Sequence, residues 1–580
     1  IAAQWTPGAV ARRTGLPLDE VERFFDLVAR TDRTVTVYSQ GVNQSAAGVD
    51  KVNAIINCHL ATGRIGKPGS GPFSVTGQPN AMGGREVGGL ANQLAAHMEI
   101  ENAEHRALVQ EFWASPNMPD KAGLKAVDMF RAVADGRIKA IWIMGTNPVD
   151  SLPDADRVAA ALAACPFVVV SDVVQRTYTT KYAHVLLPAQ AWGEKDGTVT
   201  KSGEAMPDWW ALAAVARRMG FARAFDYSGP AAVFREHAAL SGYRNSGARA
   251  FDISALSDIS DAAYRALAPF QWPWRAGEPA GAAPKRMFGD GRFVTSDGRA
   301  RLIATPFRGL AGRKGERCEF VLNTGRIRDQ WHTMTRTGVA ARLSEHIAEP
   351  FAEINPQDAA RLGVSLAGLV RLSNTRGSVT LRALVTDRQR AGSVFAPIHW
   401  TDQFASDGRV DALVAPVLDP VSGQPESKGA YVEMTALSPA WFGFALLREK
   451  PTGIEADYWA LARTDGGWRM ELAGMTACDD WDARARKMFG LKEEGAFVIS
   501  MEDARAGAWR CVAIRDGAVV GVLLVAREPI AAARAWLCEM FADPTADPQA
   551  LLAGRPPKAS KDPGQKICVC FNVGANAIRD

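Results

Sequence analysis

The chain has 580 residues, enough for about four domains of ordinary size. Its 67 Lys and Arg against 63 Asp and Glu give a formal net charge of +4, which excludes a polybasic protein that binds nucleic acid mainly by neutralising phosphates. Hydrophobic residues make up 47% of the chain, but the longest apolar run, 518–526, is far shorter than the roughly 18–20 residues of a membrane-spanning helix. Composition therefore indicates a multidomain globular protein, in which a local basic pocket can still attract an anion.

The eight cysteines do not form a disulfide framework, because six of them are scattered along a long chain. Cys568 and Cys570 form a Cys-x-Cys pair after a stretch of linker composition. One such pair cannot complete a four-sulfur site, so the pair is either half of an iron–sulfur motif or two ordinary thiols. The sequence begins at Ile1 and ends in what reads as the opening of a helix, and we therefore expect it to be a fragment of a longer chain.

The first hundred residues are predicted to combine helices and one strand with a long loop. Residues 1–33 read as helical, with a turn at 14–17 before an amphipathic stretch at 18–29, residues 34–38 read as a strand, and residues 49–61 as a further helix. Residues 63–89 contain nine glycines and are too long for an ordinary connection, which predicts a functional loop.

The next segment alternates between helices and strands that are apolar on both faces. This pattern indicates a parallel α/β sheet, in which ligands bind at the carboxyl ends of the strands. The predicted helices are 124–134 and 158–164, and the predicted strands are 138–144, 167–171 and 185–187.

Short strands return in the second half of the chain, after an irregular segment at 222–316. Their spacing, with turn residues between them, predicts a β-barrel-like domain that extends to about residue 435. Residues 440–545 have a Trp-rich, mixed α/β character, and residues 551–566 have linker composition. The predicted barrel strands are 319–323, 368–373, 378–386 and 393–397.

A short stretch of the glycine-rich loop carries both an amide and a cation. Gln78 and Arg85 lie seven residues apart among glycines that permit a close approach of the backbone to a ligand. The planar guanidinium of Arg85 suits an oxyanion. The same spacing also fits a structural loop with a surface arginine.

Polar residues follow two of the predicted parallel strands. Gly145, Thr146 and Asn147 follow one strand, where backbone N–H groups and an amide can hold a phosphate or a base, although Asn-Pro is also a common turn dipeptide. Asp172 follows the next strand and could accept hydrogen bonds from a guanine edge or a ribose, or cap a helix.

Three further positions offer contacts to a charged or aromatic ligand. Lys195 lies in a charged hairpin and Lys428 in a polar loop, where an ammonium group can bind phosphate or remain solvated. His332 lies beside Trp331 after a predicted strand, and could meet an aromatic cofactor or have only a structural role.

Taken in chain order, these motifs resemble those of one family. The chain resembles the bacterial molybdopterin oxidoreductases that carry molybdenum on two molybdopterin guanine dinucleotides, and among them the assimilatory nitrate reductase catalytic subunits. The loop from Gln78 to Gly89 is similar to the nitrate reductase version, whereas formate dehydrogenases carry a different loop there. The stretches that carry the resemblance are 41–44, 57–69, 71–74, 78–89, 144–148, 186–189, 194–198, 324–326, 331–333, 422–428 and the Cys568/Cys570 pair.

The resemblance implies an α/β fold. Doubly wound parallel-sheet lobes would bind two pterin dinucleotides, alongside a double-psi-like β-barrel and a small C-terminal α/β extension. The implied domains are 1–103, part of a molybdopterin-binding lobe with the substrate-side loop; 104–225, a second dinucleotide-binding lobe; 226–316, a linker or peripheral segment; 317–437, the β-barrel; 438–550, the extension; and 551–580, a linker and the start of a [2Fe–2S] domain.

The resemblance also implies roles for individual residues. Arg85, Gln78 and Met82 would lie on the substrate side of molybdenum, where Arg85 would orient nitrate and stabilise charge as oxygen transfers. Cys568 and Cys570 would be partial ligands of a [2Fe–2S] cluster like that of bacterioferritin-associated ferredoxin. The implied cofactor-binding residues are Asn43, Gln44, Gly145, Thr146, Asn147, Asp172, Lys195, Thr324, Gly325, Arg326, His332, Thr333 and Lys428.

The family's [4Fe–4S] cysteines and its molybdenum ligand are not found in these residues. We expect both upstream of residue 1, and we expect this fragment alone to be inactive. The implied reaction is molybdenum-dependent reduction of nitrate to nitrite by oxygen-atom transfer, in nitrate assimilation in the cytoplasm. Electrons would come from a flavoprotein reductase, a ferredoxin or a flavodoxin, and neither nucleic acid nor membrane would be a partner.

Two other classes of protein fit the same motifs. One is another enzyme with two pterin cofactors, such as a formate dehydrogenase or a periplasmic nitrate reductase. The other is a non-catalytic relative that binds nucleotide or serves in assembly. An upstream selenocysteine or cysteine with a histidine would favour formate oxidation, and the absence of the metal-ligating cysteine from the full chain would favour the non-catalytic protein.

Overall fold

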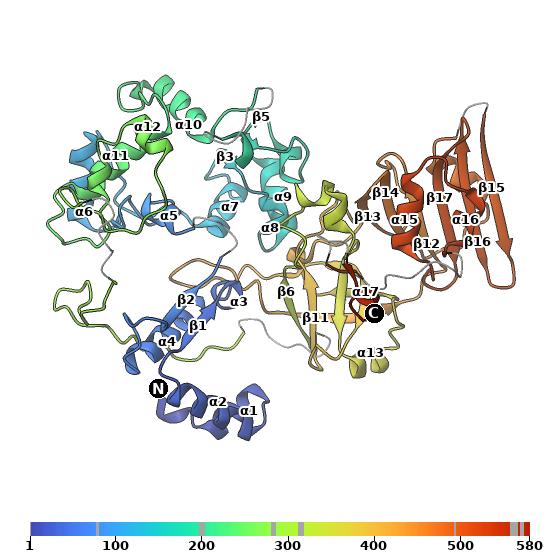
Figure 1. Cartoon of the computed structure of the whole chain (residues 1–580), viewed down its shortest axis with the longest axis horizontal. Helices are drawn as coiled ribbons and strands as arrows, with labels where there is room; N and C mark the ends of the chain where they lie inside the picture. Colours follow the sequence, from blue (N-terminus) through green and yellow to red (C-terminus); the bar gives the residue numbers. More distant parts are fainter. Residues whose placement is uncertain are drawn as a thin grey trace.

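The computed structural model describes residues 2–76, 81–195, 204–279, 286–310, 318–491, 495–556, 566–568 and 573–579. Figure 1 shows a closed barrel at the centre, helical and parallel-sheet regions on one side of it and a large sheet on the other. The predicted α/β class, with parallel-sheet regions and a β-barrel, is confirmed. The boundaries between the domains stay predictions.

The N-terminal helices and strand form as predicted, but the expected long loop does not. Instead, residues 63–89 contain a strand, β2, that pairs in parallel with β1 from Val35↔Gly71 to Tyr38↔Ser74, and a short helix, α5. A four-residue strand has too few side chains to show a period, so only its pairing reveals it. The elements are α1 (Pro7–Thr14), α2 (Leu18–Arg30), β1 (Val35–Tyr38), α3 (Gln40–Asn43), α4 (Gly48–Ala61), β2 (Gly71–Ser74) and α5 (Ala81–Glu86).

The second segment forms the predicted three-stranded parallel sheet, in the order β3-β4-β5. Its core contains Leu162, Val168 and Val170, none of which is exposed to solvent. The apolar runs therefore became buried strands, as their composition predicts. The elements are α6 (Ala103–Trp113), α7 (Ala126–Ala134), β3 (Ala140–Met144), α8 (Pro148–Ser151), α9 (Ala155–Ala164), β4 (Phe167–Asp172) and β5 (Val185–Pro188).

The segment expected to be irregular contains helices that were not predicted from the sequence. Helix α11 packs its small residues into a core with Leu240 and Phe251, and a face made largely of alanine gives a weak apolar period. The prediction of an irregular segment at 226–316 is therefore wrong for its first part. The helices within this segment are α11 (Pro230–Gly242) and α12 (Asp261–Arg265), and α10 (Asp208–Ala216) precedes it.

The barrel closes in the order β10-β6-β11-β8-β9-β7, around a core that includes Leu322, Ile354 and Val370. All four predicted barrel strands are present, and two strands were not predicted, β7 and β11. The elements are β6 (Phe320–Gly325), β7 (Phe351–Ile354), α13 (Pro356–Leu362), β8 (Leu369–Ser373), β9 (Ser378–Val385), β10 (Ser393–Pro397) and β11 (Ala430–Leu437).

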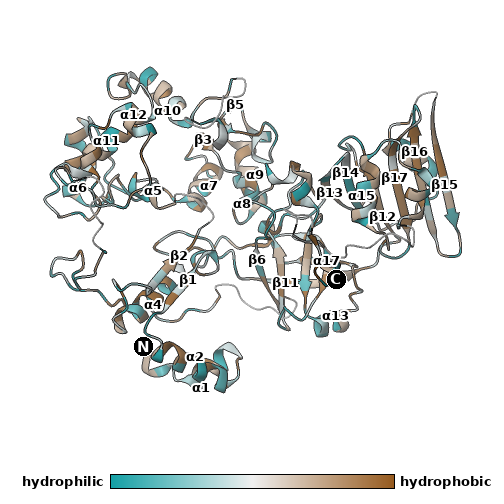
Figure 2. Ribbon diagram, in the orientation of Figure 1, coloured by the Kyte–Doolittle hydropathy of each residue, from teal (hydrophilic) through white to brown (hydrophobic). Residues whose placement is uncertain are grey.

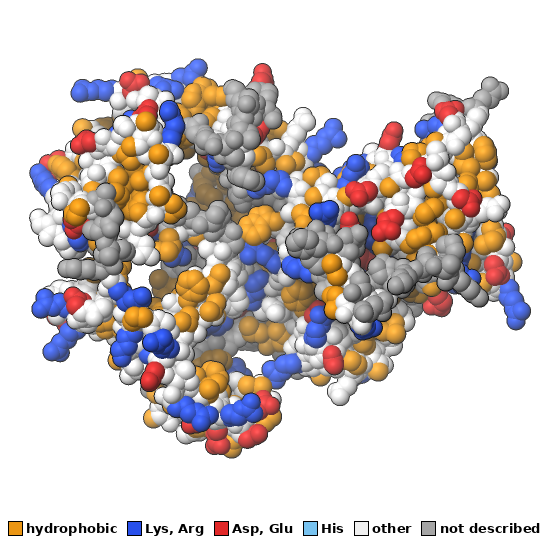
Figure 3. All heavy atoms as spheres, in the orientation of Figure 1, with side chains coloured by type: hydrophobic (Ala, Val, Ile, Leu, Met, Phe, Trp, Pro, Cys, Tyr) orange, Lys and Arg blue, Asp and Glu red, His pale blue; other side chains and the backbone are white. Residues whose placement is uncertain are grey.

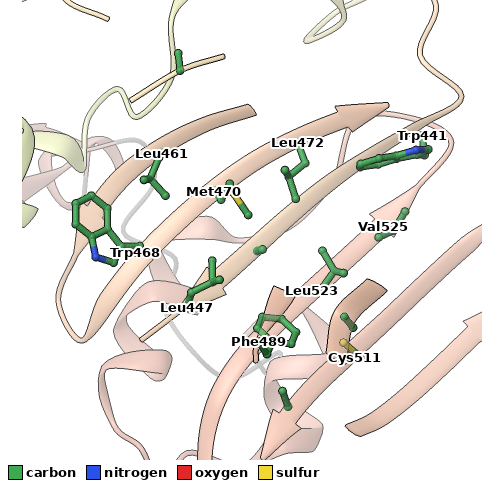
Figure 4. Packing of buried hydrophobic residues seen from close by; sticks show 14 of the residues in the cluster. Trp441, Leu447, Leu461, Trp468, Met470, Leu472, Phe489, Cys511, Leu523 and Val525 are labelled. Atoms are coloured by element: carbon green, nitrogen blue, oxygen red, sulfur yellow. The ribbon is translucent and has the colours of Figure 1, made fainter. Parts of the chain in front are cut away.

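A six-stranded antiparallel sheet follows, in the order β13-β14-β12-β17-β16-β15. Figure 4 shows Trp441, Met470 and Leu523 among the apolar side chains packed against its strands. The elements are β12 (Trp441–Leu447), β13 (Tyr458–Thr464), β14 (Gly467–Gly474), α14 (Trp481–Met488), β15 (Ala496–Asp503), β16 (Ala508–Arg515), β17 (Ala518–Ala526), α15 (Arg534–Ala542), α16 (Pro548–Ala553), β18 (Lys566–Cys568), β19 (Val573–Gly574) and α17 (Ala575–Arg579).

Hydropathy follows this architecture. Figure 2 shows brown, apolar segments concentrated in the strands of the barrel and of the C-terminal sheet, with teal residues in many of the connecting loops. Within the described ranges, the helices are all too short or too polar to span a bilayer.

Candidate functional site

A polar junction joins the carboxyl end of β3 to the barrel. Asn147, which is buried, donates from Nδ2 to Asp150 Oδ2 at 2.6 Å and to Thr333 Oγ1 at 3.2 Å. Its Oδ1 accepts from the backbone N–H of Thr179 at 3.2 Å and from the Thr179 hydroxyl at 2.5 Å. The side chain that the sequence singled out after β3 therefore links three separate segments, including a barrel loop that lies 186 residues away along the chain.

Two buried carboxyl groups lie at this junction. Burial raises the pKa of Asp150 to about 7, against the Arg409 guanidinium and the Asn147 amide, which lower it. Burial likewise raises the pKa of Asp411 to about 7, against Lys428 and Arg409. Because a carboxyl with a pKa near neutrality is protonated for part of the time, it can donate a hydrogen bond as well as accept one.

On the barrel side, the end of β6 and the loop before β11 meet. Lys428 donates from Nζ to the carbonyl oxygen of Thr324 at 2.7 Å, and the buried hydroxyl of Thr324 donates to the carbonyl of Ser427 at 2.6 Å. A Cβ at Gly325 would lie 2.5 Å from the ring of Phe395, so glycine is required there. Burial lowers the pKa of Lys428 to about 8, while Asp411 favours its charged form.

The loop after β6 carries a second cation and a histidine. Burial lowers the pKa of Arg326, whose guanidinium lies 5.5 Å from the centre of the Trp331 ring. His332 adopts a left-handed φ of 43°, and burial, with Arg326 and Arg336 nearby, lowers its pKa. Both residues therefore face a partly desolvated environment rather than open water.

His399 holds this loop in place. Its Nδ1 bonds the carbonyl oxygen of His332 at 2.7 Å, and its Nε2 accepts from the backbone N–H of Ile327 at 2.9 Å. These two bonds require a neutral ring with the proton on Nδ1. Burial lowers the pKa of His399 to about 4, which is consistent with a neutral ring at pH 7. The side chain is fully buried, so it supports the loop and does not meet a ligand directly.

The loop that carries Lys428 also reaches the N-terminal segment. Asp419 Oδ2 accepts from the backbone N–H of Val49 at 3.1 Å, and Glu426 Oε2 accepts from that of Ala46 at 3.1 Å. Asn43 and Gln44 lie at the end of α3, immediately before these contacts. The structure thus connects the neighbourhood of Asn43 and Gln44 with the loop of Lys428.

The α5 segment borders a different space. Met82 lines a cavity of about 1160 Å³ whose other walls come from residues 65–72, 234–272 and 286–288. Arg85 is exposed and does not line this cavity, and Gln78 lies outside the described residues. The lining of this cavity includes neither Asn147 nor His332, so the cavity is separate from the junction.

Five other predicted residues lie apart from the junction or outside the described residues. Lys195 pairs with Asp208 over 3.7 Å and is half exposed, while Thr146 is exposed beside Asn147. Burial raises the pKa of Asp172, although the backbone N–H groups of Val174 and Val173 and the charge of Arg336 lower it. Cys568 ends β18, with its side chain outside the description, and Cys570 lies outside the described residues altogether. In the rest of the described chain no three His, Cys, Asp or Glu side chains are placed to hold a metal ion.

The junction fits a large ligand with phosphate and base groups. Gly145 has a φ of 59° at the end of β3, with open space where a Cβ would lie. Figure 3 shows the molecule hollowed between the helical regions and the barrel, with Lys and Arg side chains around the hollow. Three buried polar atoms around the junction have no partner among the described residues: Asp150 Oδ1, Arg326 Nε and Asp402 Oδ1. Unpartnered donors and acceptors of this kind are what a pterin dinucleotide would satisfy.

Asp150, His399 and Asp411 were not predicted from the sequence. Asp150 follows Asn147 by three residues and could have been found as the next polar side chain of that turn. His399 and Asp411 gave no local signal, because each acquires its role only from partners on other segments of the barrel domain.

Two family models match the chain. The model described as "Molybdopterin oxidoreductase" matches residues 22–217, and the model described as "Molydopterin dinucleotide binding domain" matches residues 320–431. The Asn147–Thr333 hydrogen bond therefore joins the two matched regions.

Curated relatives give the same assignment. A nitrate reductase of Klebsiella oxytoca is 44% identical over 100% of this chain and 67% of its own length. The assimilatory nitrate reductase catalytic subunit of Bacillus subtilis is 31% identical over 72% of this chain and 59% of its own length. The F420-dependent formate dehydrogenase subunit alpha of Methanocaldococcus jannaschii is 30% identical over 75% of this chain and 63% of its own length. The chain thus spans about three fifths to two thirds of the length of these relatives.

Proposed function

The chain belongs to the molybdopterin oxidoreductase family, and we propose that the protein to which it belongs reduces nitrate to nitrite in nitrate assimilation. The observation that carries this proposal is the likeness to a nitrate reductase over the whole of the chain. The shorter matches to formate dehydrogenases make formate oxidation the second candidate.

The junction supplies groups to hold a molybdopterin guanine dinucleotide. Arg326 and Lys428 present cations for phosphate oxygens, while Asn147 and Asp150 present hydrogen-bonding groups for a base or a ribose. When bound, the molybdenum cofactor supplies the electrons and the centre that accepts oxygen in the reaction. The part played by this chain is to orient the cofactor and to exclude water from the junction.

Nitrate needs a positive environment more than an acid–base pair, because it is a planar, weakly basic anion. Arg85 lies in the last turn of α5 and is exposed, so its guanidinium is available to an incoming anion. We assign Arg85 to orienting nitrate, with Met82 on the same short helix beside it and Gln78 a few residues earlier in the chain.

The rest of the electron path is also part of the proposal. Cys568 and Cys570 would bind part of a [2Fe–2S] cluster, and a [4Fe–4S] cluster held by other residues of the protein would pass electrons onward. The electron donor would be a flavoprotein reductase, a ferredoxin or a flavodoxin, and the reaction would take place in the cytoplasm.

The test compares substitutions of Arg85 in the full-length enzyme. We expect Arg85→Ala to lower kcat/KM for nitrate by about a hundredfold, the effect of removing one group that stabilises developing charge, and Arg85→Lys to keep part of the activity. Molybdenum content is measured in parallel and should not change. Arg23→Ala on α2, an exposed arginine outside the cavity that Met82 lines, is the matched control.

Two results would contradict the proposal. Unchanged nitrate kinetics in Arg85→Ala would remove Arg85 from the substrate role. A full-length enzyme that oxidises formate and does not reduce nitrate would replace the proposed reaction with the second candidate.

A further inference from the structure

Helix α5 is tied to the helical region of α6, α11 and α12 through the residue that follows Arg85. Glu86 Oε1 accepts from the indole N–H of Trp272 at 2.7 Å, across 186 residues of sequence. The carbonyl oxygen of Glu86 accepts from the backbone N–H of Ala96 at 2.6 Å. Both the side chain and the backbone of Glu86 are therefore engaged by partners outside α5.

The backbone that follows α5 is packed too closely to shift. Gly88 has a φ of 77°, and a Cβ there would lie 2.6 Å from the carbonyl carbon of Leu94. The backbone that leaves α5 thus packs directly on residues 94–96, which belong to the same apolar core as Phe251.

Trp272 is partly buried and packs against that core, where it also lines the cavity beside α5. Its ring makes edge contacts with Phe251, at 5.4 Å between centroids, and with His97, at 5.7 Å. The indole N–H of Trp272 keeps its position because the ring packs on Phe251 and His97. Its hydrogen bond therefore restricts the direction of the Glu86 carboxylate, since a rotation of α5 would break that bond.

We propose that the Glu86–Trp272 hydrogen bond positions Arg85 for nitrate, by fixing the rotation of α5. Glu86 and Arg85 are neighbours in the last turn of this six-residue helix, so any rotation of α5 moves both side chains together. A helix this short is marginal by itself and takes its orientation from such outside contacts. Glu86 and Trp272 are positioning residues, and the inference rests on the proposed role of Arg85.

The test removes the donor and keeps the ring, in the full-length enzyme. We expect Trp272→Phe to lower kcat/KM for nitrate about tenfold and to do so by less than twofold in an Arg85→Ala background, because there is then no guanidinium to misplace. Glu86→Gln keeps an oxygen that can accept from the indole and should keep most of the activity, whereas Glu86→Ala should behave like Trp272→Phe.

A second readout does not depend on turnover. Hydrogen exchange of a peptide that covers α5 should become about tenfold faster in Trp272→Phe, and exchange of β15 and β16 at the other end of the molecule should not change (Figure 1). Trp274→Phe is the matched control, because the Trp274 indole donates to the carbonyl oxygen of Glu278 and not to α5.

The outcomes separate the two proposals. Equal losses of activity in the Arg85 and Arg85→Ala backgrounds, or unchanged exchange of α5 in Trp272→Phe, would overturn the positioning role. A wild-type enzyme that does not reduce nitrate would overturn the proposed function instead, and the exchange experiment would then decide alone whether the bond fixes α5.

Discussion

Asn147 makes the junction between β3 and the barrel unusually sensitive to one substitution. Asn147→Ala removes four hydrogen bonds, two donated to Asp150 and Thr333 and two accepted from Thr179. At about 1 kcal/mol for each bond, the β3 region should lose about 4 kcal/mol of stability. Much of this loss in stability comes from Asp150, because its Oδ1 has no partner among the described residues and Asn147→Ala also removes the hydrogen bond to its Oδ2.

Peptide-resolved hydrogen exchange measures this effect where it arises. A loss of about 4 kcal/mol corresponds to about a thousandfold faster exchange of the amides of β3 through local opening. Thr333→Val breaks only the bond between the two regions and should cost about 1 kcal/mol. Asn245→Ala is the control, since Asn245 also makes several side-chain bonds, but around Arg249 and Ser241. An increase of less than about tenfold for β3 in Asn147→Ala would refute the reasoning.

Two further predictions concern buried charge. Because burial raises the pKa of Asp411 in the folded protein, the free energy of unfolding of the wild type should fall by about 3 kcal/mol as the pH rises from 5 to 8. Asp411→Asn should not show this fall. Urea denaturation at a series of pH values measures the difference, with the exposed Asp135→Asn as control. Burial raises the pKa of Glu471, but Arg534 and Arg469 outweigh it and hold that pKa at about 2, so Glu471→Gln should cost about 3–5 kcal/mol at pH 7. The contribution of this depressed carboxyl is lost as the pH falls from about 4.5 toward 2, so the gap between wild type and variant should close over that range; a gap independent of pH would contradict the assignment.

The sequence predicted those elements whose own residues show a clear periodic pattern or a strongly apolar composition. The apolar runs that became β3 and β4 are long enough, and apolar enough on both faces, to be read directly. Strand β7 has four residues and one polar side chain, and becomes a strand only through its partners β9 and β10. Helix α11 buries alanines, which contribute little to an apolar period, and it was missed for that reason.

The site was predictable only in part. Asn147 and Lys428 were found because each lies in a polar loop at the end of a strand, and the structure engages both in buried contacts. The pairing of Asn147 with Thr333, and of Lys428 with Thr324, depends on how distant segments pack, which no local pattern encodes. Lys195 gave a similar local signal, yet it forms a solvent-accessible pair with Asp208.

The way in which the junction is held together suits a protein that must admit a large cofactor between its lobes. Two ion pairs join the α/β region to the segment after β10: Lys181 pairs with Asp402, and Arg409 pairs with Asp156. Pairs of this kind are worth little when exposed, whereas each unpartnered buried polar atom costs about 1–3 kcal/mol. These contacts therefore hold the junction together less strongly than an apolar interface of the same size would. We expect groups of a bound dinucleotide that satisfy Arg326 Nε and Asp150 Oδ1 to remove part of that cost, and therefore expect cofactor binding to stabilise the contact between the α/β region and the barrel.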